Sequence, residues 1–182
     1  AEDQAPQERL GQIRQLQIRL NDEAKELRAE VKDARVKAAE DRETRMADVH
    51  AALKMQGMEG YKFMPGDAIV FRTGWEAYWE DPPKFNDGCP GIGMEVARWI
   101  AEEIHAGITA GDTWPVDAIP NPDPACAFCV HNYLQTRHGI VNQENLRLKE
   151  LADLGIYEFA YFFAPSPIRG ATGANGNPVA IW

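Results

Sequence analysis

Residues 94–110, MEVARWIAEEIHAGITA, contain the pattern that decides the fold of this chain. The apolar residues that recur at helical spacing in its first part are Val96, Ala97, Ile100 and Ile104. Gly107 is expected to end this helix, and Ile108 begins a short apolar run that is typical of a buried strand. A helix that leads directly into a buried strand indicates a sheet covered by helices, which is an α/β fold.

The same alternation of helices and strands extends in both directions from this segment. Further helices are expected at residues 48–56, 127–138 and 146–154. Further strands are expected at residues 68–71, 157–163 and 178–182, the last of which should close the sheet. Residues 73–90 and 112–124 contain several prolines and are expected to form loops. Residues 46–182 therefore predict one α/β region.

The first 45 residues have a different texture from the rest. They contain no aromatic residue, no Gly after Gly11 and no Pro after Pro6. The a and d positions of a heptad repeat are held by Leu10, Ile13, Gln17, Leu20, Ala24, Leu27, Val31, Ala34 and Ala38. This pattern predicts a long amphipathic helix over residues 1–45.

Charged residues flank this heptad seam. Glu23 with Arg28, and Glu30 with Arg35, fall at g and e positions, where they can pair between two helices. Two interpretations of the helix stay open. It forms a coiled coil that makes the protein a homo-oligomer, or it is a single amphipathic helix that lies on its own domain.

The composition excludes several classes of protein. Hydrophobic residues make up 45% of the 182 residues and charged residues 26%, as in ordinary globular domains. The formal net charge of −9 argues against binding to nucleic acid or to anionic membranes, since both need a basic face. No apolar run approaches the roughly 20 residues that span a bilayer. The polar N-terminus resembles no signal peptide, so a cytoplasmic location is expected, with a removed export signal as the alternative.

The three cysteines are Cys89, Cys126 and Cys129. An odd and low number is a poor disulfide framework, so reduced thiols are expected. The run Cys126-Ala-Phe-Cys129-Val-His131 resembles half of a zinc-binding sequence, but the chain has no second Cys-x-x-Cys pair. The favoured interpretation is that these cysteines are small apolar residues in a packed segment.

Residues 131–152, HNYLQTRHGIVNQENLRLKELA, contain the strongest candidate for a functional site. His131 and Glu144 flank a short apolar turn, and imidazole and carboxylate are both ordinary ligands of zinc and manganese. A hydrolytic metal site needs about three protein ligands and an open position for water. Asp112, at the end of a predicted strand, is a candidate for a third carboxylate or for a group that hydrogen-bonds to a ligand.

Two other motifs have structural and functional interpretations. Trp75, Tyr78 and Trp79 lie in a predicted loop, where they could line the pocket of a small-molecule substrate or form a satellite core. The Gly-rich run at residues 170–176 lacks the Lys and the helix that follow a phosphate loop, and it predicts a connection between two strands.

Several runs, taken together in this order, resemble the cyclase family of metal-dependent hydrolases, which includes bacterial kynurenine formamidase and isatin hydrolase. They are PGDAIVFRTGW, PGIGMEVARWIAE, GDTWPVDAIPNPDP, the run at residues 131–152, and YEFAYFFAPSPIRGATGANGNPVAI. The resemblance covers about three quarters of the chain. It implies a swivelling β/β/α fold, a divalent metal (Zn or Mn), and hydrolysis of an amide, ester or lactam. It also implies that His131 and Glu144 are metal ligands.

The chain departs from the family in one respect. The family's main metal motif, of the form HxGTHxDxPxH, has no counterpart in this sequence. Two hypotheses follow for the function. The first is a metal-dependent hydrolase whose missing ligands come from elsewhere. The second is a non-catalytic assembly protein that keeps the α/β scaffold and oligomerises through its N-terminal helix.

Overall fold

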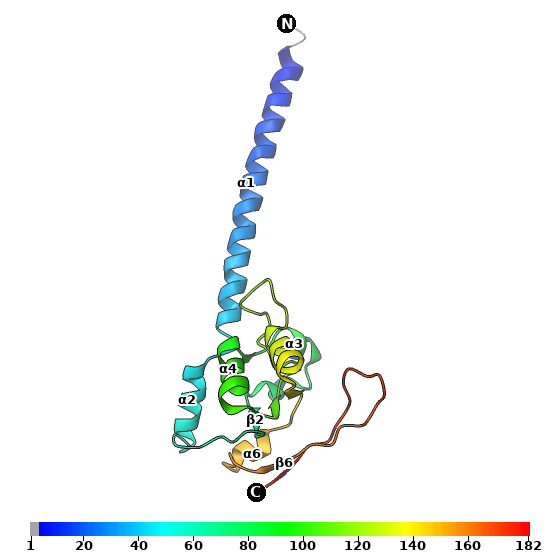
Figure 1. Cartoon of the computed structure of the whole chain (residues 1–182). Helices are drawn as coiled ribbons and strands as arrows, with labels where there is room; N and C mark the ends of the chain where they lie inside the picture. The colour runs from blue at the N-terminus through cyan, green and yellow to red at the C-terminus, as the bar shows by residue number, and fades with distance from the viewer. Residues whose placement is uncertain (1–3) are drawn as a thin grey trace.

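The computed structural model describes the backbone of residues 4–182 and the side chains of residues 14–182. A single long helix, α1 (Gln4–Glu40), projects from a mixed domain that the remaining residues form (Figure 1). The predicted helix over residues 1–45 is therefore present from Gln4 to Glu40. The first three residues and the side chains of Leu10 and Ile13 lie outside the described part.

The domain is built on a small parallel sheet. Its three strands are β2 (Ala68–Phe71), β4 (Ile108–Gly111) and β5 (Val141–Gln143), in the order β2-β4-β5. Parallel neighbours need long crossover connections, and helical segments supply both of them. The predicted strands at residues 68–71 and 108–110 are confirmed. Strand β5 was not predicted. It is only three residues long and contains Asn142 and Gln143, so it has no apolar pattern.

The helical segments of the two crossovers pack against one face of this sheet. The first crossover contains η1 (Trp75–Tyr78), α3 (Pro82–Asn86), α4 (Met94–Arg98) and its π-helical continuation η2 (Trp99–Ile104). The second crossover contains α5 (Cys129–His131) and its π-helical continuation η3 (Asn132–Arg137). The predicted helices at residues 94–106 and 127–138 are thus confirmed in kind.

The core lies between these helices and the sheet. The predicted inward residues Val96, Ala97 and Ile100 are fully buried, and Ile104 is 5% exposed. They pack in one cluster with Leu134 of η3 and with Ile69 and Val130, among others. A second, smaller cluster joins Ala110 to Leu146 and Leu148. Successive residues of a strand point to opposite faces, so the sheet separates the two clusters.

Shorter elements complete the domain. Helix α2 (Met46–Met55) follows α1, and helix α6 (Lys149–Asp153) lies near the end of β5 in sequence. A two-residue parallel pair, β1 (Glu43–Thr44) and β3 (Gly91–Ile92), joins the end of α1 to the segment before α4. The predicted helices at residues 48–56 and 146–154 are confirmed, the second in a shorter form.

The C-terminal strands do not close the main sheet, contrary to the prediction. Strands β6 (Ala160–Phe162) and β7 (Val179–Ile181) pair antiparallel in a separate two-stranded ribbon (Figure 1). The Gly-rich residues 170–176 lie in the connection between them, as predicted. The hydroxyl of Tyr161 donates to Gln143 of β5, so a side chain rather than a backbone ladder ties the ribbon to the main sheet.

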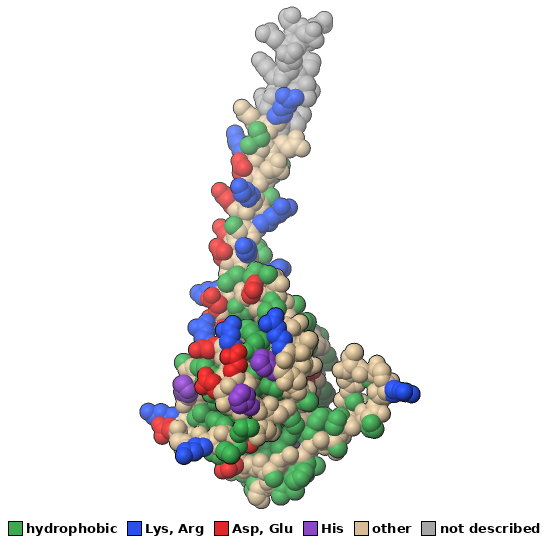
Figure 2. Space-filling model, in the orientation of Figure 1, with side chains coloured by type: hydrophobic (Ala, Val, Ile, Leu, Met, Phe, Trp, Pro, Cys, Tyr) green, Lys and Arg blue, Asp and Glu red, His purple; other side chains and the backbone are tan. Residues whose placement is uncertain are grey.

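Mixed charge covers the projecting helix. Figure 2 shows basic and acidic side chains along its length. Every side chain from residue 14 to residue 35 is exposed, so this part of α1 is not packed into the core of the domain. Ala39, near the end of the helix, is buried. Among the described residues, no helix is both long and apolar enough to cross a bilayer.

Candidate functional site

The structure brings the two predicted metal ligands together. His131 is the last residue of α5, and Glu144 follows directly after β5. The imidazole Nε2 of His131 lies 2.8 Å from Oε1 of Glu144. The chain after β5 runs beside the end of β4, where the amide of Asn145 donates to the carbonyl of Thr113 at 2.9 Å. The carboxyl edge of the parallel sheet therefore positions Glu144.

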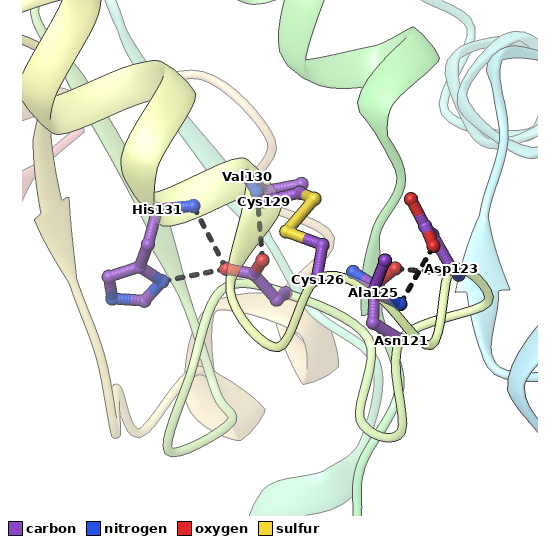
Figure 3. Close-up of a disulfide and its surroundings, with 8 residues drawn as sticks. Asn121, Asp123, Ala125, Cys126, Cys129, Val130 and His131 are labelled. Carbon is purple, nitrogen blue, oxygen red and sulfur yellow. Dashed lines mark hydrogen bonds and ion pairs between the residues drawn. A yellow bond between two sulfur atoms is a disulfide. The ribbon is translucent and has the colours of Figure 1, made fainter.

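A buried carboxylate that sequence reasoning missed holds the other side of the imidazole. Asp117 is fully buried, and its Oδ2 lies 2.6 Å from Nδ1 of His131 (Figure 3). The same oxygen accepts the backbone N–H of His131 at 3.1 Å, and Oδ1 accepts the N–H of Val130 at 2.8 Å. This contact orients the ring and leaves Nε2 directed toward Glu144.

The backbone around Asp117 is itself fixed by close packing. Gly91 of β3 lies against it, and a Cβ added at Gly91 would be 2.3 Å from the carbonyl carbon of Asp117. The amide of Ile92 donates to the carbonyl of Val116 at 3.0 Å. Glycine is needed at position 91 because any side chain there would push Asp117 away from His131.

These two carboxylates control the protonation of His131. Burial alone would lower the pKa of the imidazole, but the hydrogen bonds from Asp117 and Glu144 outweigh it and raise the pKa to about 9. Without a cation, the ring is therefore protonated at neutral pH. A divalent cation bound between Nε2 and Glu144 would have to displace this proton.

The donors fit part of a divalent metal site. A neutral imidazole with Asp on its far nitrogen and an adjacent carboxylate are suitable ligands for zinc or manganese. Within residues 14–182, however, no group of three or more His, Cys, Asp or Glu side chains could hold a metal ion. The carboxylate of Asp117 is hydrogen-bonded to Nδ1 of His131. Nε2 of His131 and the carboxylate of Glu144 are therefore the two groups left to bind a metal. The described residues would therefore supply only two ligands to a metal ion, and this pair, His131 and Glu144, is called the half-site below.

Asp112, the candidate for a third carboxylate, makes its hydrogen bonds to the loop after β2. Its fully buried carboxylate accepts from the backbone amide and hydroxyl of Thr73, at 2.9 and 2.8 Å, and from the amide of Gly74 at 2.7 Å. The amide of Glu76 is a fourth donor, at 3.4 Å. Asp112 thus caps the loop after β2, and the carboxylate that contacts His131 is that of Asp117.

The three aromatic residues predicted as a substrate surface pack on one another and on α3. The rings of Trp75 and Tyr78 meet edge to face, as do those of Trp79 and Phe85. The indole of Trp75 donates to the carbonyl of Phe85 at 3.1 Å, and the ammonium of Lys84 lies 5.2 Å from the Trp75 ring. Tyr78 and Trp79 nevertheless remain 40% and 58% exposed. Substrate binding by Trp75, Tyr78 and Trp79 stays a prediction.

Cys126 and Cys129 form a disulfide, so the prediction of reduced thiols is wrong for this pair (Figure 3). The odd total misled the prediction because Cys89 is a free, fully buried thiol. The Cα atoms of the bonded pair are 5.6 Å apart, which is a normal separation for a disulfide. Both bonded cysteines are half-buried.

A groove lies next to the disulfide. It has a volume of about 720 Å³ and is formed by the lower part of α1 and by the loop before α5. Its lining includes Leu27, Val31, Trp114, Cys126 and Phe128. None of the three predicted substrate residues lines it. Phe128 connects the groove to the half-site, because its ring lies 5.7 Å from the ring of His131, centre to centre.

Sequence signals for the missed residues were weak. Asp117 stands in the apolar run Pro115-Val116-Asp117-Ala118, and an acidic residue between apolar neighbours is the one available clue. Nothing in the sequence shows that it pairs with a histidine fourteen positions later. Phe128 carried no signal either, because a single phenylalanine is an ordinary core residue.

Comparisons with known proteins place the chain in a family. The sequence model described as "Putative cyclase" matches residues 18–118, more than half of the chain. His131 and Glu144 lie outside that range. A crystal structure described as a novel cyclase is 31% identical, with a TM-score of 0.63, and covers 76% of this chain and 46% of its own. No curated protein matches significantly.

Two further solved structures share the fold. Isatin hydrolase A from Ralstonia solanacearum is 22% identical, with a TM-score of 0.61, and covers 84% of this chain and 56% of its own. Isatin hydrolase A from Labrenzia aggregata, bound to benzyl benzoate, is 19% identical, with a TM-score of 0.60, and covers 80% of this chain and 57% of its own. The chain thus spans about half the length of each of these proteins and has the predicted cyclase-family α/β fold.

Proposed function

The chain belongs to the cyclase family, and on this premise we propose that it contributes half of the active site of a metal-dependent hydrolase. The observation that carries the proposal is the line of contacts from Asp117 through the imidazole of His131 to Glu144. A buried carboxylate on one ring nitrogen is the usual support of a metal-binding histidine, and here the other ring nitrogen faces a second carboxylate, that of Glu144. The remaining ligands would come from another polypeptide segment.

Each of these residues has a distinct part in the proposed reaction. Asp117 holds the Nδ1–H tautomer of His131, so that Nε2 presents a lone pair when the ring is neutral. Glu144 supplies the carboxylate donor at the mouth of the half-site, where its side chain is 30% exposed. When bound, a zinc or manganese ion supplies Lewis-acid activation of water and of a substrate carbonyl.

The proposed substrate is a small molecule with an amide, ester or lactam bond. Isatin, a cyclic amide, is the substrate named for the two hydrolases with this fold, and it is a reasonable first compound to test. An N-formyl aromatic amide is the second. The half-site lies beside the aromatic ring of Phe128, which would favour flat aromatic substrates.

Metal analysis tests the proposal directly. We expect the purified chain to bind Zn or Mn weakly, through His131 and Glu144, after incubation with either metal. His131→Ala and Glu144→Ala should each abolish this binding. His138→Ala is the matched control, because His138 lies in the same segment and its ring packs on Tyr133 instead. Wild-type protein that retains neither metal would contradict the proposal.

A second candidate function is that of an assembly protein. It is supported by the exposed apolar side chains along α1, where Leu20 and Leu27 are 57% and 61% exposed. A coiled coil between two copies would bury this seam. Deletion of residues 1–35 should then convert a dimer to a monomer, as measured by sedimentation. A full-length chain that is monomeric at high concentration would exclude this function.

A further inference from the structure

We propose that Cys126 and Cys129 form a redox-active disulfide that a dithiol reductant opens reversibly, and that its oxidation state controls how firmly His131 is held. The inference goes beyond the proposed hydrolase function, and it rests on that function only for its consequence for metal binding. It is carried by the position of the disulfide: Cys126 lines the groove, and Cys129 is two residues before His131 in the same segment (Figure 3).

The first step in the argument is the continuity of the chain. The disulfide joins residues only three positions apart, and Cys129 is followed directly by Val130 and His131. The backbone amides of these two residues both donate to Asp117. A covalent constraint on Cys129 therefore limits the motion of the segment that must meet this carboxylate.

The second step is the residue enclosed by the disulfide. Phe128 lies between the two cysteines, and its ring contacts two others edge to face. The ring centres are 5.7 Å from His131 and 6.1 Å from Trp114. Phe128 is nevertheless 43% exposed, so few other contacts hold it. Opening the disulfide would allow Phe128 to move, and the imidazole of His131 would then lose its contact with the Phe128 ring.

The third step is that the fold does not depend on the bond. Neither cysteine belongs to the two clusters of buried residues that form the core. A disulfide that closes so short a loop constrains the unfolded chain less than one that closes a long loop. Both sulfur-bearing residues are half-buried, and Cys126 lines the open groove, so a reductant can reach the bond.

The chemistry is ordinary thiol–disulfide exchange. A thiolate of the dithiol attacks one cysteine sulfur, the Sγ–Sγ bond breaks, and a mixed disulfide forms. The second thiol of the reductant then attacks its own sulfur in the mixed disulfide, and the cysteine of the protein leaves as a thiolate. Two electrons and two protons pass to Cys126 and Cys129, which become thiols, and the reductant becomes a cyclic disulfide.

Alkylation and amide exchange together test the proposal on the full chain without metal. After treatment with dithiothreitol, iodoacetamide should label Cys126 and Cys129 in the folded protein, and reoxidation should restore the disulfide. Cys89 is the internal control, because burial raises the pKa of its thiol to about 12 and keeps it unlabelled until the protein unfolds. No disulfide after oxidation, or no labelling after reduction, would overturn the proposal.

The effect on His131 is read from hydrogen exchange of the amides of Val130 and His131, measured by NMR. We expect exchange to become about tenfold faster in the reduced form, since the opening of this segment becomes easier. The double variant Cys126→Ser/Cys129→Ser should exchange at the reduced rate whether or not a reductant is present. Equal exchange rates in the oxidised and reduced forms would refute control of His131, whatever the outcome of the metal analysis.

Discussion

Asp117 binds His131 twice through a single carboxylate oxygen, which accepts the backbone N–H at 3.1 Å and lies 2.6 Å from Nδ1 of the ring. Asp117→Asn replaces one of the two acceptor oxygens with an NH2 group, so that either the N–H of Val130 or the two donors of His131 lose their acceptor. We expect metal affinity to fall by about 10- to 100-fold, as is usual when the partner of a metal-binding histidine is lost. Competition titration with a zinc chelator would measure it.

The control for this variant is Asp123→Asn. Asp123 lies in the same loop, but it is exposed and accepts only local donors, such as the amide of Ala125 at 2.9 Å. Its zinc affinity should equal that of the wild type. If the two variants bind zinc equally well, Asp117 does not support the site.

Protonation of His131 should make the stability of the metal-free protein depend on pH. The pKa of this residue is raised to about 9 in the folded state, from roughly 6.5 in an unfolded chain. The stabilisation is therefore complete below pH 6.5 and is lost as the pH rises through 9. For a partly exposed ring, we expect a loss on the order of 2 kcal/mol.

Urea unfolding at a series of pH values checks this dependence. The His131→Gln variant is the control, because it lacks the titrating group. Its free energy of unfolding should change less than that of the wild type between pH 6 and pH 10. Identical pH profiles for the two proteins would show that His131 is not held between its carboxylates.

We predict that Asp112 contributes to the stability of the fold and not to metal binding. Its buried carboxylate accepts four hydrogen bonds from the loop after β2. Asp112→Ala leaves those donors without a partner and should cost about 3 kcal/mol or more. Asp81→Ala removes only an exposed helix cap, whose bond to the amide of Lys84 is 3.3 Å long, and should cost about 1 kcal/mol. Thermal unfolding of both variants would test the difference.

A charge placed in the heptad seam should separate any coiled-coil dimer. Leu20 occupies a d position and Ile18 a b position, and the two side chains are 57% and 60% exposed. Leu20→Lys would bury a charge in a dimer and should produce monomers, whereas Ile18→Lys should not. Sedimentation equilibrium distinguishes these results. Equal behaviour of the two variants would mean that the seam forms no interface.

The sequence predicted those elements whose apolar pattern is long or bounded by strong stop signals. The helix around Ile100 and the strands on either side of it are examples, because burial dictates their residues directly. Strand β5 was missed because a three-residue strand is defined by its neighbour β4 and not by its own composition. The C-terminal strands were placed in the wrong sheet for the same reason. The apolar pattern of a strand does not show which other strand it pairs with.

The candidate site was predictable in part for a similar reason. His131 and Glu144 were predicted from a family resemblance, and their side chains lie 2.8 Å apart, whereas their role as metal ligands stays a prediction. The role of Asp117 could not be predicted because it depends on a contact between distant segments. The disulfide could not be predicted because the number of cysteines does not reveal which of them are bonded. Asp112 and Asp117 are both buried and both follow β4 in the sequence, and only their contacts distinguish them.

The projecting helix also affects how the size of this protein is measured. At about 1.5 Å per residue, the 37 residues of α1 extend for roughly 55 Å, most of it away from the domain. Such a rod increases hydrodynamic drag without adding much mass. A monomer will therefore leave a gel-filtration column early, at the volume of a heavier compact protein, and an apparent dimer in that experiment is not evidence of association.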